Sequence, residues 1–245
     1  MIDLYFWPTP NGKKVTILLE EASIPYRIKP LNIVKGEQFD ESYLALNPNH
    51  RMPTMVDSDP LGGGAAISVF ESGAILMYLA EKSGQFWPQS TDKKYAVVQW
   101  LIWQMANMGP KIGEYNHFNR LGSEQGDQSY AIRRFDDEAN RLYGVLNYAL
   151  HKHEFVAGAE YSIADMSVIP WAMNWKAHGQ DLDVFPHVKR WLELVLSRPG
   201  VQRGLDVGKE LTVDPNTFTP EEKERFRRLL FNQRAIPVPG GESDA

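Results

Sequence analysis

Two polar residues, Thr9 and Asn11, stand at a predicted strand-to-helix turn. They belong to the run Pro8-Thr9-Pro10-Asn11-Gly12, which follows a β-prone segment and precedes a helical pattern. A hydroxyl, a side-chain amide and the free N–H groups of a helix start can all donate hydrogen bonds to an anion. Thr and Asn are also good N-cap residues, so one of them can cap the helix while the other contacts a ligand.

A second polar pair, Glu71 and Ser72, opens a predicted helix directly after a predicted strand. The free N–H groups and the positive dipole end of a helix N-terminus bind carboxylates well. Ser72 and its backbone N–H could therefore take a ligand carboxylate, and Glu71 could pair with a ligand ammonium. The alternative is structural, because Ser-type residues routinely cap helices.

The composition excludes several kinds of chemistry. The 245 residues contain no cysteine, which excludes a protein thiol as nucleophile, disulfides and thiolate zinc sites. Lysine and arginine total 26 against 31 acidic residues, and the net charge of -5 argues against a general nucleic-acid binder. No apolar run approaches the roughly 20 residues needed to span a bilayer. Asp3 stands where a signal peptide would carry positive charge, which favours a cytoplasmic protein.

The elements that position these residues change in character near residue 90. Before that point strand and helix signals alternate, and the Gly-rich run at 57–64 indicates a hairpin loop. The expected elements are a strand at 2–7, a helix that ends before Pro25, a strand that begins at Tyr26, a short helix at 41–46, strands at 53–57 and 66–70, and a helix from Glu71 that ends at Gly84.

After a short linker near residues 85–92 the pattern becomes helical. A helix is expected from about Asp92 until Gly109-Pro110 breaks or kinks it, and further helices are expected near Tyr130–His151, Ile163–His178 and Phe185–Ser197. Ser162 and Asp165 form an S-x-x-D capping box before an apolar run, for which we favour a purely structural interpretation. A charged helix at Pro220–Phe231 precedes a tail at 237–243 that is typical of disorder.

This order of elements resembles the glutathione transferases. Three segments carry the resemblance: Leu4–Val15, which is similar to the Nu class with its thiol-contacting Thr and Asn; Phe70–Ile75, which is similar to the glutathione-anchoring turn; and Tyr161–Asp165, which matches the capping box of the helical domain. The resemblance covers the chain up to about Pro199. Within the family it is strongest to bacterial glutathione-dependent disulfide-bond oxidoreductases and to fungal nitrogen-regulatory proteins with the same fold.

The resemblance implies an α/β plus all-α fold. Residues 1–84 are expected to form a thioredoxin-like, glutathione-binding domain, and residues 92–200 an all-helical domain. Residues 201–245 are expected to form a C-terminal extension with the charged helix and the disordered tail.

Glutathione presents two carboxylates, an ammonium and a thiol, and the resemblance implies a partner for each. Thr9 and Asn11 are the implied catalytic residues, because they would stabilise the thiolate of a thiol whose ordinary pKa is about 8.5. Ser72 would take the γ-glutamyl carboxylate and Glu71 the γ-glutamyl ammonium. Some classes use a tyrosine near the end of the first strand, but the Thr-Pro-Asn pattern here favours Tyr5 as a packing residue.

Further glutathione-binding residues are implied by the same resemblance. A cis bond between Met52 and Pro53 would turn the Met52 backbone toward the cysteinyl unit, whereas an ordinary trans proline at a strand start is the alternative. Gln38 would contact the peptide through its amide, and the alternative is a solvated loop residue. Arg134 would reach a glutathione carboxylate, with Arg133 as its register-shifted competitor, and the alternative is that both are plain charges on a helix surface.

For the other aromatic and histidine residues that we consider, we favour a structural role. His117 could contact a second substrate, but we favour a hydrogen-bonded structural histidine. Five tryptophans at helical spacings are expected to lie in the core: Trp100, Trp103, Trp171, Trp175 and Trp191.

The resemblance implies a cytoplasmic homodimer that reduces small disulfides with glutathione as co-substrate and without a metal. Peroxide reduction and weak conjugation to electrophiles are implied as side activities, and no nucleic-acid or membrane partner is expected. Disulfide reduction needs one thiolate to attack and a second thiol to resolve the mixed disulfide. Because the chain has no cysteine, both sulfurs must come from glutathione. The alternative function is a glutathione-binding regulatory or carrier protein with little catalysis.

Overall fold

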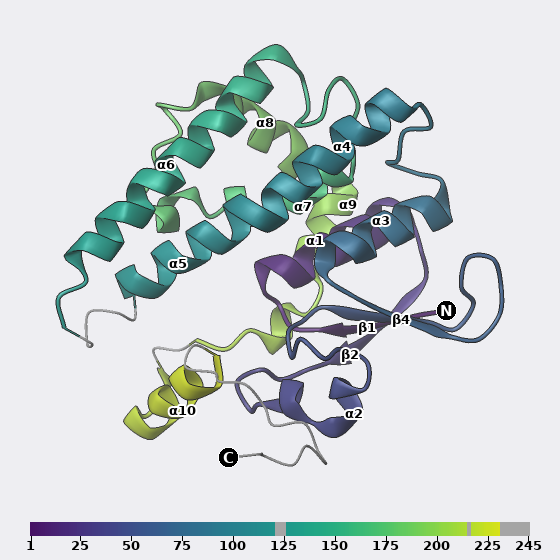
Figure 1. The fold of residues 1–245 in the computed structure, drawn as a ribbon, viewed down its shortest axis with the longest axis horizontal. Helices are drawn as coiled ribbons and strands as arrows, with labels where there is room; N and C mark the ends of the chain where they lie inside the picture. Colours follow the sequence, from purple (N-terminus) through teal and green to yellow (C-terminus); the bar gives the residue numbers. More distant parts are fainter. Residues whose placement is uncertain (121–125, 215–216, 231–245) are drawn as a thin grey trace, which may run out of the picture.

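The first third of the chain folds around a four-stranded mixed sheet (Figure 1). The computed structural model describes residues 1–120, 126–214 and 217–230. β1 (Ile2–Phe6) pairs in parallel with β2 (Tyr26–Pro30) and antiparallel with β3 (Thr54–Asp57), which pairs antiparallel with β4 (Ile67–Phe70). The order β2-β1-β3-β4 confirms the predicted β-α-β unit and hairpin.

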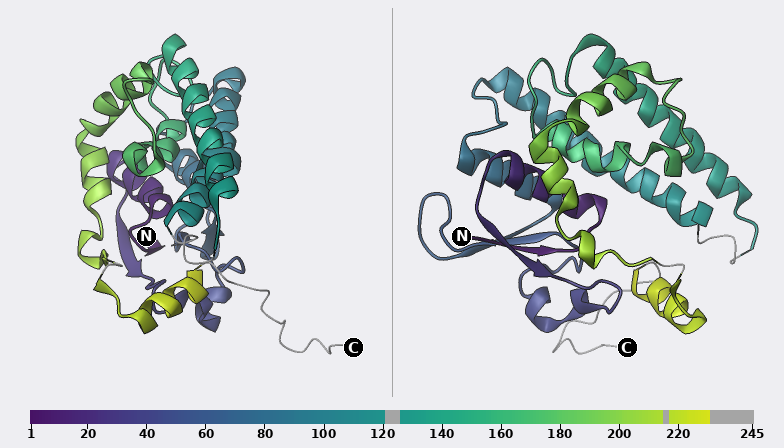
Figure 2. Two further views of the ribbon diagram at one scale, coloured as in Figure 1. Left: turned by 90° about the vertical axis from the view of Figure 1, so that its left-hand side faces the viewer. Right: turned by 180° about the vertical axis from the view of Figure 1, so that it is seen from behind.

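Helices cover both faces of this sheet. α1 (Pro10–Glu21) and α3 (Ser72–Ser83) lie on the face toward the helical half, and α2 (Glu41–Leu44) lies on the opposite face after the 3₁₀ turn η1 (Glu37–Phe39) (Figures 1 and 2). Alternate residues of β1 are buried, and apolar positions of α1 and α3 join them in one hydrophobic core. The sheet is therefore the platform on which α1 and α3 are fixed relative to each other.

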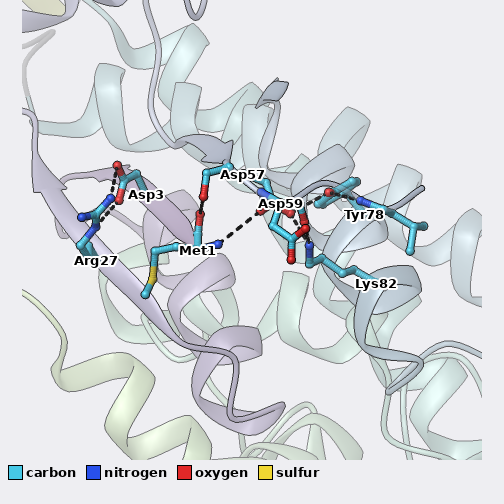
Figure 3. Close-up of polar contacts among 9 residues, drawn as sticks. Met1, Asp3, Arg27, Asp57, Asp59, Tyr78 and Lys82 are labelled. Carbon is cyan, nitrogen blue, oxygen red and sulfur yellow. Dashed lines mark hydrogen bonds and ion pairs between the residues drawn. The ribbon is translucent and has the colours of Figure 1, made fainter. Parts of the chain in front are cut away.

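Asp57, a fully buried carboxylate at the end of β3, ties the sheet to α3 (Figure 3). It accepts hydrogen bonds from Lys82 Nζ at 2.7 Å and from the Tyr78 hydroxyl at 2.8 Å, and the N-terminal amine of Met1 lies 3.8 Å away. Burial by itself raises the pKa of Asp57, but the bonds from Lys82, the Asp59 backbone and Tyr78 outweigh burial and lower that pKa. Asp57 is thus an ionised structural anchor.

The second half of the chain is helical and stacks on α1 and α3 (Figure 2). Its elements are α4 (Thr91–Trp103), the π-helical segment η2 (Gln104–Met108), α5 (Gly109–Arg120), α6 (Ser129–Lys152), α7 (Ile163–Ala172), η4 (Trp175–His178), α8 (Pro186–Leu196), α9 (Pro199–Asp206) and η5 (Lys209–Leu211). The thioredoxin-like half followed by a helical half confirms the predicted fold class.

The capping box of α7 has the predicted structural role. The Asp165 carboxylate accepts hydrogen bonds from the Ser162 backbone at 3.0 Å, from the Val156 backbone at 2.9 Å and from Trp191 Nε1 at 2.9 Å. Burial raises the pKa of Asp165 to about 6, against the effect of these hydrogen bonds. The box therefore joins the start of α7 to the preceding loop and to α8.

Of the two outcomes expected at Gly109-Pro110, a break or a kink, the break does not occur. The chain stays helical from α4 through η2 into α5, and Pro110 occupies the first turn of α5, where its missing N–H and fixed φ are tolerated. The observed irregularity is the π-helical segment before it, a feature that is frequent at functional sites. α7 also ends earlier than predicted, because the chain after Ala172 forms a turn and then η4.

α9 was not predicted, although it packs more closely on α1 than any other helix does among the described residues. Thr16 donates a hydrogen bond to the Gly204 carbonyl at 2.7 Å, and Arg198 pairs with Glu21 at 2.8 Å. A Cβ at Gly204 would lie 2.5 Å from the Ile17 Cα, so only glycine permits this approach. Residue 201, where an extension was expected to begin, lies inside α9.

The predicted charged helix near the C-terminus is α10 (Pro220–Leu230), which lies beside the sheet on the side of α2 (Figures 1 and 2). Arg225 donates to the Lys35 carbonyl at 3.1 Å. The tail at 237–243 lies outside the described residues. None of the helices in the described part of the chain is long and apolar enough to cross a membrane. The division into domains at 1–84, 92–200 and 201–245 stays a prediction.

Candidate functional site

A cavity of about 770 Å³ lies where the N-terminal ends of α1 and α3 meet the helical half. Its wall also includes the loops before and after α2, the π-helical segment η2, the start of α5 and Trp171 of α7. This volume is in the range of small-molecule sites. Six predicted site residues line the cavity: Thr9, Asn11, Gln38, Met52, Glu71 and Ser72.

Thr9 is the N-cap of α1, and this confirms the capping interpretation for one of the two residues at the turn. Its Oγ1 accepts a hydrogen bond from the Gly12 backbone at 3.3 Å and donates to Met52 Sδ at 3.0 Å. The peptide bond between Met52 and Pro53 is cis, as expected. The hydroxyl of Thr9 is therefore already engaged on both its donor and its acceptor side.

Asn11 lies in the first turn of α1, and its side chain is held from the other half of the molecule. Trp171 Nε1 on α7 donates a hydrogen bond to Asn11 Oδ1 at 3.1 Å. Because an indole N–H can only donate, this bond fixes which end of the amide faces α7. Among the described residues the Asn11 Nδ2 group has no hydrogen-bond partner, so it is available to an anion in the cavity.

The side chains of Glu71 and Ser72 do not cap α3, which argues against the purely structural alternative for this pair. Glu71 is the N-cap residue with φ of 69°, but no side-chain capping bond is formed. A non-glycine residue with positive φ is uncommon and is concentrated at functional sites. Glu71 is exposed at the cavity and accepts a bond from Asn49 at 3.2 Å, whereas Ser72 is buried beneath it.

Several buried polar atoms at the cavity have no hydrogen-bond partner within the described residues. They are both amide atoms of Gln38, Nδ1 of His50 and Nε2 of Gln104. Gln38 is only 1% exposed. Since buried polar groups are nearly always satisfied by protein or by water, these unpaired groups are available to whatever polar molecule occupies the cavity.

The polar and aromatic residues of the cavity wall that the sequence analysis missed include Lys14, His50, Arg51, Gln104, Glu114 and Trp171. Trp171 was expected to be a plain core residue, and that expectation is corrected by its bond to Asn11. His117, for which both interpretations were open, also lines the cavity. For Arg51 the position next to Met52 was a usable signal; Lys14 and Gln104 come together through packing between α1 and η2.

The two arginines of α6 and Tyr5 lie apart from these groups. Arg134 is not among the cavity-lining residues; its Nη1 lies 3.8 Å from Glu138, and the side chain is 55% exposed. Arg133 lies over the Tyr130 ring, with its guanidinium carbon 5.8 Å from the ring centroid. Tyr5 packs against another tyrosine of the core and does not line the cavity.

The chemistry of the cavity is that of an anion and peptide site. Two helix N-termini and an unpaired amide donor face the same space, together with Arg51, while Glu71 supplies a negative charge for an ammonium. In the part of the chain that the structure describes, no three His, Asp or Glu side chains gather in a way that could hold a metal ion.

The family models that match this chain describe the two domains of one family. The model of the glutathione S-transferase N-terminal domain matches residues 2–81, and that of the C-terminal domain matches residues 110–199. The disulfide-bond oxidoreductase YfcG of Escherichia coli strain K12 is 45% identical over 84% of this chain and 94% of its own length.

Two solved structures were determined with glutathione species bound. A glutathione transferase family member from Pseudomonas fluorescens with two glutathiones bound has a TM-score of 0.78 and 38% identity, over 83% of this chain and 92% of that one. A glutathione transferase from Pseudomonas putida with one glutathione disulfide per subunit has a TM-score of 0.79 and 37% identity, over 84% and 91%. By its fold, its cavity and these matches, the chain belongs to the glutathione S-transferase family.

Proposed function

We propose that this protein reduces small disulfides and takes both reducing thiols from glutathione. The observation that carries the proposal is a cavity with an available amide donor at Asn11 in a chain that has no cysteine of its own. The site can stabilise a thiolate, but the thiolate must arrive with the ligand. The relative from Escherichia coli is named a disulfide-bond oxidoreductase, which supports the same reaction.

The cavity residues can pair with every polar group of glutathione except the glycyl carboxylate. In the proposed arrangement Ser72 and the α3 N-terminus bind the γ-glutamyl carboxylate, and Glu71 binds the γ-glutamyl ammonium. The backbone of Met52, fixed by Pro53, pairs with the cysteinyl unit, and Gln38 bonds the peptide through its unpaired amide. The thiol lies between Thr9 and Asn11.

The proposed role of Arg134 requires it to reach a carboxylate from outside the cavity wall. Its side chain is long, exposed and only loosely paired with Glu138. A ligand that extends toward α6 could therefore recruit it without breaking a buried bond.

The reaction proceeds in two thiol–disulfide exchanges. The first glutathione thiolate attacks one sulfur of the substrate disulfide, which forms a mixed disulfide and releases one substrate thiolate that then takes a proton. A second glutathione thiolate attacks the glutathione sulfur of the mixed disulfide and releases the second substrate thiol. The products are two substrate thiols and one oxidised glutathione, so atoms and electrons balance.

Two features of the bound relatives support a site for two glutathione units. One holds two glutathiones, and another holds one glutathione disulfide per subunit. We further propose that the protein acts as a homodimer in the cytoplasm, as its family does, and that peroxide reduction and weak conjugation are side activities of the same thiolate. A small disulfide or electrophile is the second substrate.

The proposal is tested by two assays run side by side at saturating glutathione. One follows reduction of a small model disulfide, and the other follows conjugation of a chlorinated nitrobenzene. Disulfide reduction should be the faster reaction, and prior treatment of the protein with an alkylating reagent, then removed, should leave it unchanged. Faster conjugation would instead assign an ordinary transferase. Loss of both activities with tight glutathione binding retained would favour the regulatory or carrier alternative.

A further inference from the structure

Lys14 is a buried lysine at the floor of the cavity, one turn into α1. Its side chain is almost wholly buried, with 1% of the residue exposed. Its Nζ lies 2.5 Å from Gln104 Oε1, 3.4 Å from Ser72 Oγ and 3.7 Å from Met105 Sδ. Among the described residues, Glu71 is the only charged side chain that acts on it.

A cation in this position is unfavourable unless something compensates it. Lysines are rarely buried without a carboxylate partner, because removal of an ammonium from water is strongly disfavoured. Burial lowers the pKa of Lys14 well below its ordinary value, while the charge of Glu71 acts in the opposite direction. For packing alone, an apolar side chain of the same length would serve better at this position.

Ser72 connects Lys14 to the open part of the cavity. In the contact between them, the Lys14 Nζ group is the donor and the serine oxygen is the acceptor. The hydroxyl hydrogen is then left for another partner, and its only partner among the described residues is Met105 Sδ at 3.5 Å, a weak acceptor. A ligand carboxylate would be a far stronger acceptor for that hydrogen.

We propose that Lys14 is a positioning residue for the γ-glutamyl carboxylate and acts on it through Ser72. Nζ holds Oγ as an acceptor, the Ser72 hydroxyl hydrogen points at the carboxylate, and the positive charge behind the serine offsets the negative charge in front of it. A carboxylate bound at Ser72 in turn favours the protonated form of Lys14. This inference rests on the proposed function, because it presupposes that glutathione binds here.

Calorimetry with two thiol-blocked ligands isolates the contribution of the γ-glutamyl carboxylate to the binding free energy. The first is S-methylglutathione. The second is its analogue with a 4-aminobutyryl group in place of the γ-glutamyl group, which keeps the ammonium and lacks only the neighbouring carboxylate. Lys14→Met should weaken binding of the first by about tenfold to a hundredfold, the range of one charge-assisted hydrogen bond. Binding of the second should change by less than about twofold.

Two controls separate this role from damage to the fold. Lys13→Met removes the same charge from the preceding residue. The Lys13 Nζ group bonds the Leu205 and Val207 carbonyls and does not line the cavity, so this variant should bind both ligands with unchanged affinity. Lys14→Gln keeps a polar group beside Gln104 without the charge, and should lose the carboxylate preference as Lys14→Met does.

Each outcome decides one question. Equal losses for both ligands, or no loss for S-methylglutathione in either Lys14 variant, would overturn the role of Lys14. Failure of the unaltered protein to bind S-methylglutathione would instead overturn the proposed function. Circular dichroism at the titration temperature confirms that each variant is folded, and Lys14→Gln alone carries the test if Lys14→Met does not fold.

Discussion

Thr9 and Asn11 are two residues apart in the same turn, yet they have different hydrogen-bond partners. The Thr9 hydroxyl caps α1 and donates to Met52 Sδ, a weak acceptor, so a ligand sulfur would have to displace that contact to receive the hydrogen. Within the described residues Asn11 is bonded through its carbonyl oxygen, toward Trp171, and keeps two N–H donors for the cavity. At the scale of the residue, Asn11 is therefore the stronger candidate for the thiolate partner.

Asn11→Ala should raise the apparent pKa of the bound glutathione thiol. A hydrogen bond to a charged group contributes about 1.5–3 kcal/mol, which corresponds to roughly one to two pKa units. A higher thiol pKa means less thiolate at neutral pH, so turnover should fall at least about tenfold there and recover as the pH rises. The measurement is the pH–rate profile, with the glutathione dissociation constant determined in parallel and expected to change little.

Thr9→Ala is the matched comparison for this prediction. Loss of the N-cap should lower the free energy of unfolding by about 1 kcal/mol, with a smaller rise in the thiol pKa than Asn11→Ala gives. If neither variant raises the thiol pKa, the thiol lies elsewhere, and Tyr5→Phe is the next variant to examine.

At the scale of the elements, the site depends on how α7 and η2 meet α1. Trp171 and Asn11 are 160 residues apart in sequence, and Lys14 and Gln104 are 90 apart. The π-helical segment places Gln104 and Met105 at the cavity. A π-helix turns less per residue than an α-helix does, so these two side chains would point in other directions if α4 continued as a regular α-helix.

Trp171→Phe should lower disulfide turnover by about fivefold, the value of one neutral hydrogen bond, with little change in glutathione affinity. The ring still fills its place, but the Asn11 amide is no longer held in one orientation. Trp175→Phe is the control, since that residue does not line the cavity. In the double variant with Asn11→Ala, Trp171→Phe should have almost no further effect, because Trp171 acts only through Asn11. Fully additive losses would refute this coupling.

The elements differed in how well the sequence predicted them, for physical reasons. The hairpin was predicted because its Gly-rich loop and β-prone flanks are local signals, and the capping box of α7 was predicted from Ser162 and Asp165. η2 was missed because a π-helical segment has no sequence signature that distinguishes it from a continuous helix. α9 was missed because it is short, and its position depends on a close approach to α1 at Gly204.

At the scale of the whole molecule, the cavity belongs to neither half alone. The helix N-termini, Gln38 and Met52 come from the thioredoxin-like half, and their place at the cavity could be predicted because each lies in a short, recognisable segment. Trp171 and Gln104 come from the helical half, where they look like ordinary interior residues. Side chains whose function depends on contacts between the halves could not be identified from one sequence.

Glutathione is proposed to occupy this cavity with its sulfur beside Asn11, and the cavity is proposed to leave room for a second glutathione sulfur. Diffraction from crystals soaked with oxidised glutathione is the direct test of this arrangement. We expect one γ-glutamyl carboxylate at Ser72 and the disulfide sulfurs within hydrogen-bond distance of Asn11 Nδ2. Oxidised glutathione bound outside the cavity, or sulfurs placed next to Tyr5 instead of Asn11, would contradict it.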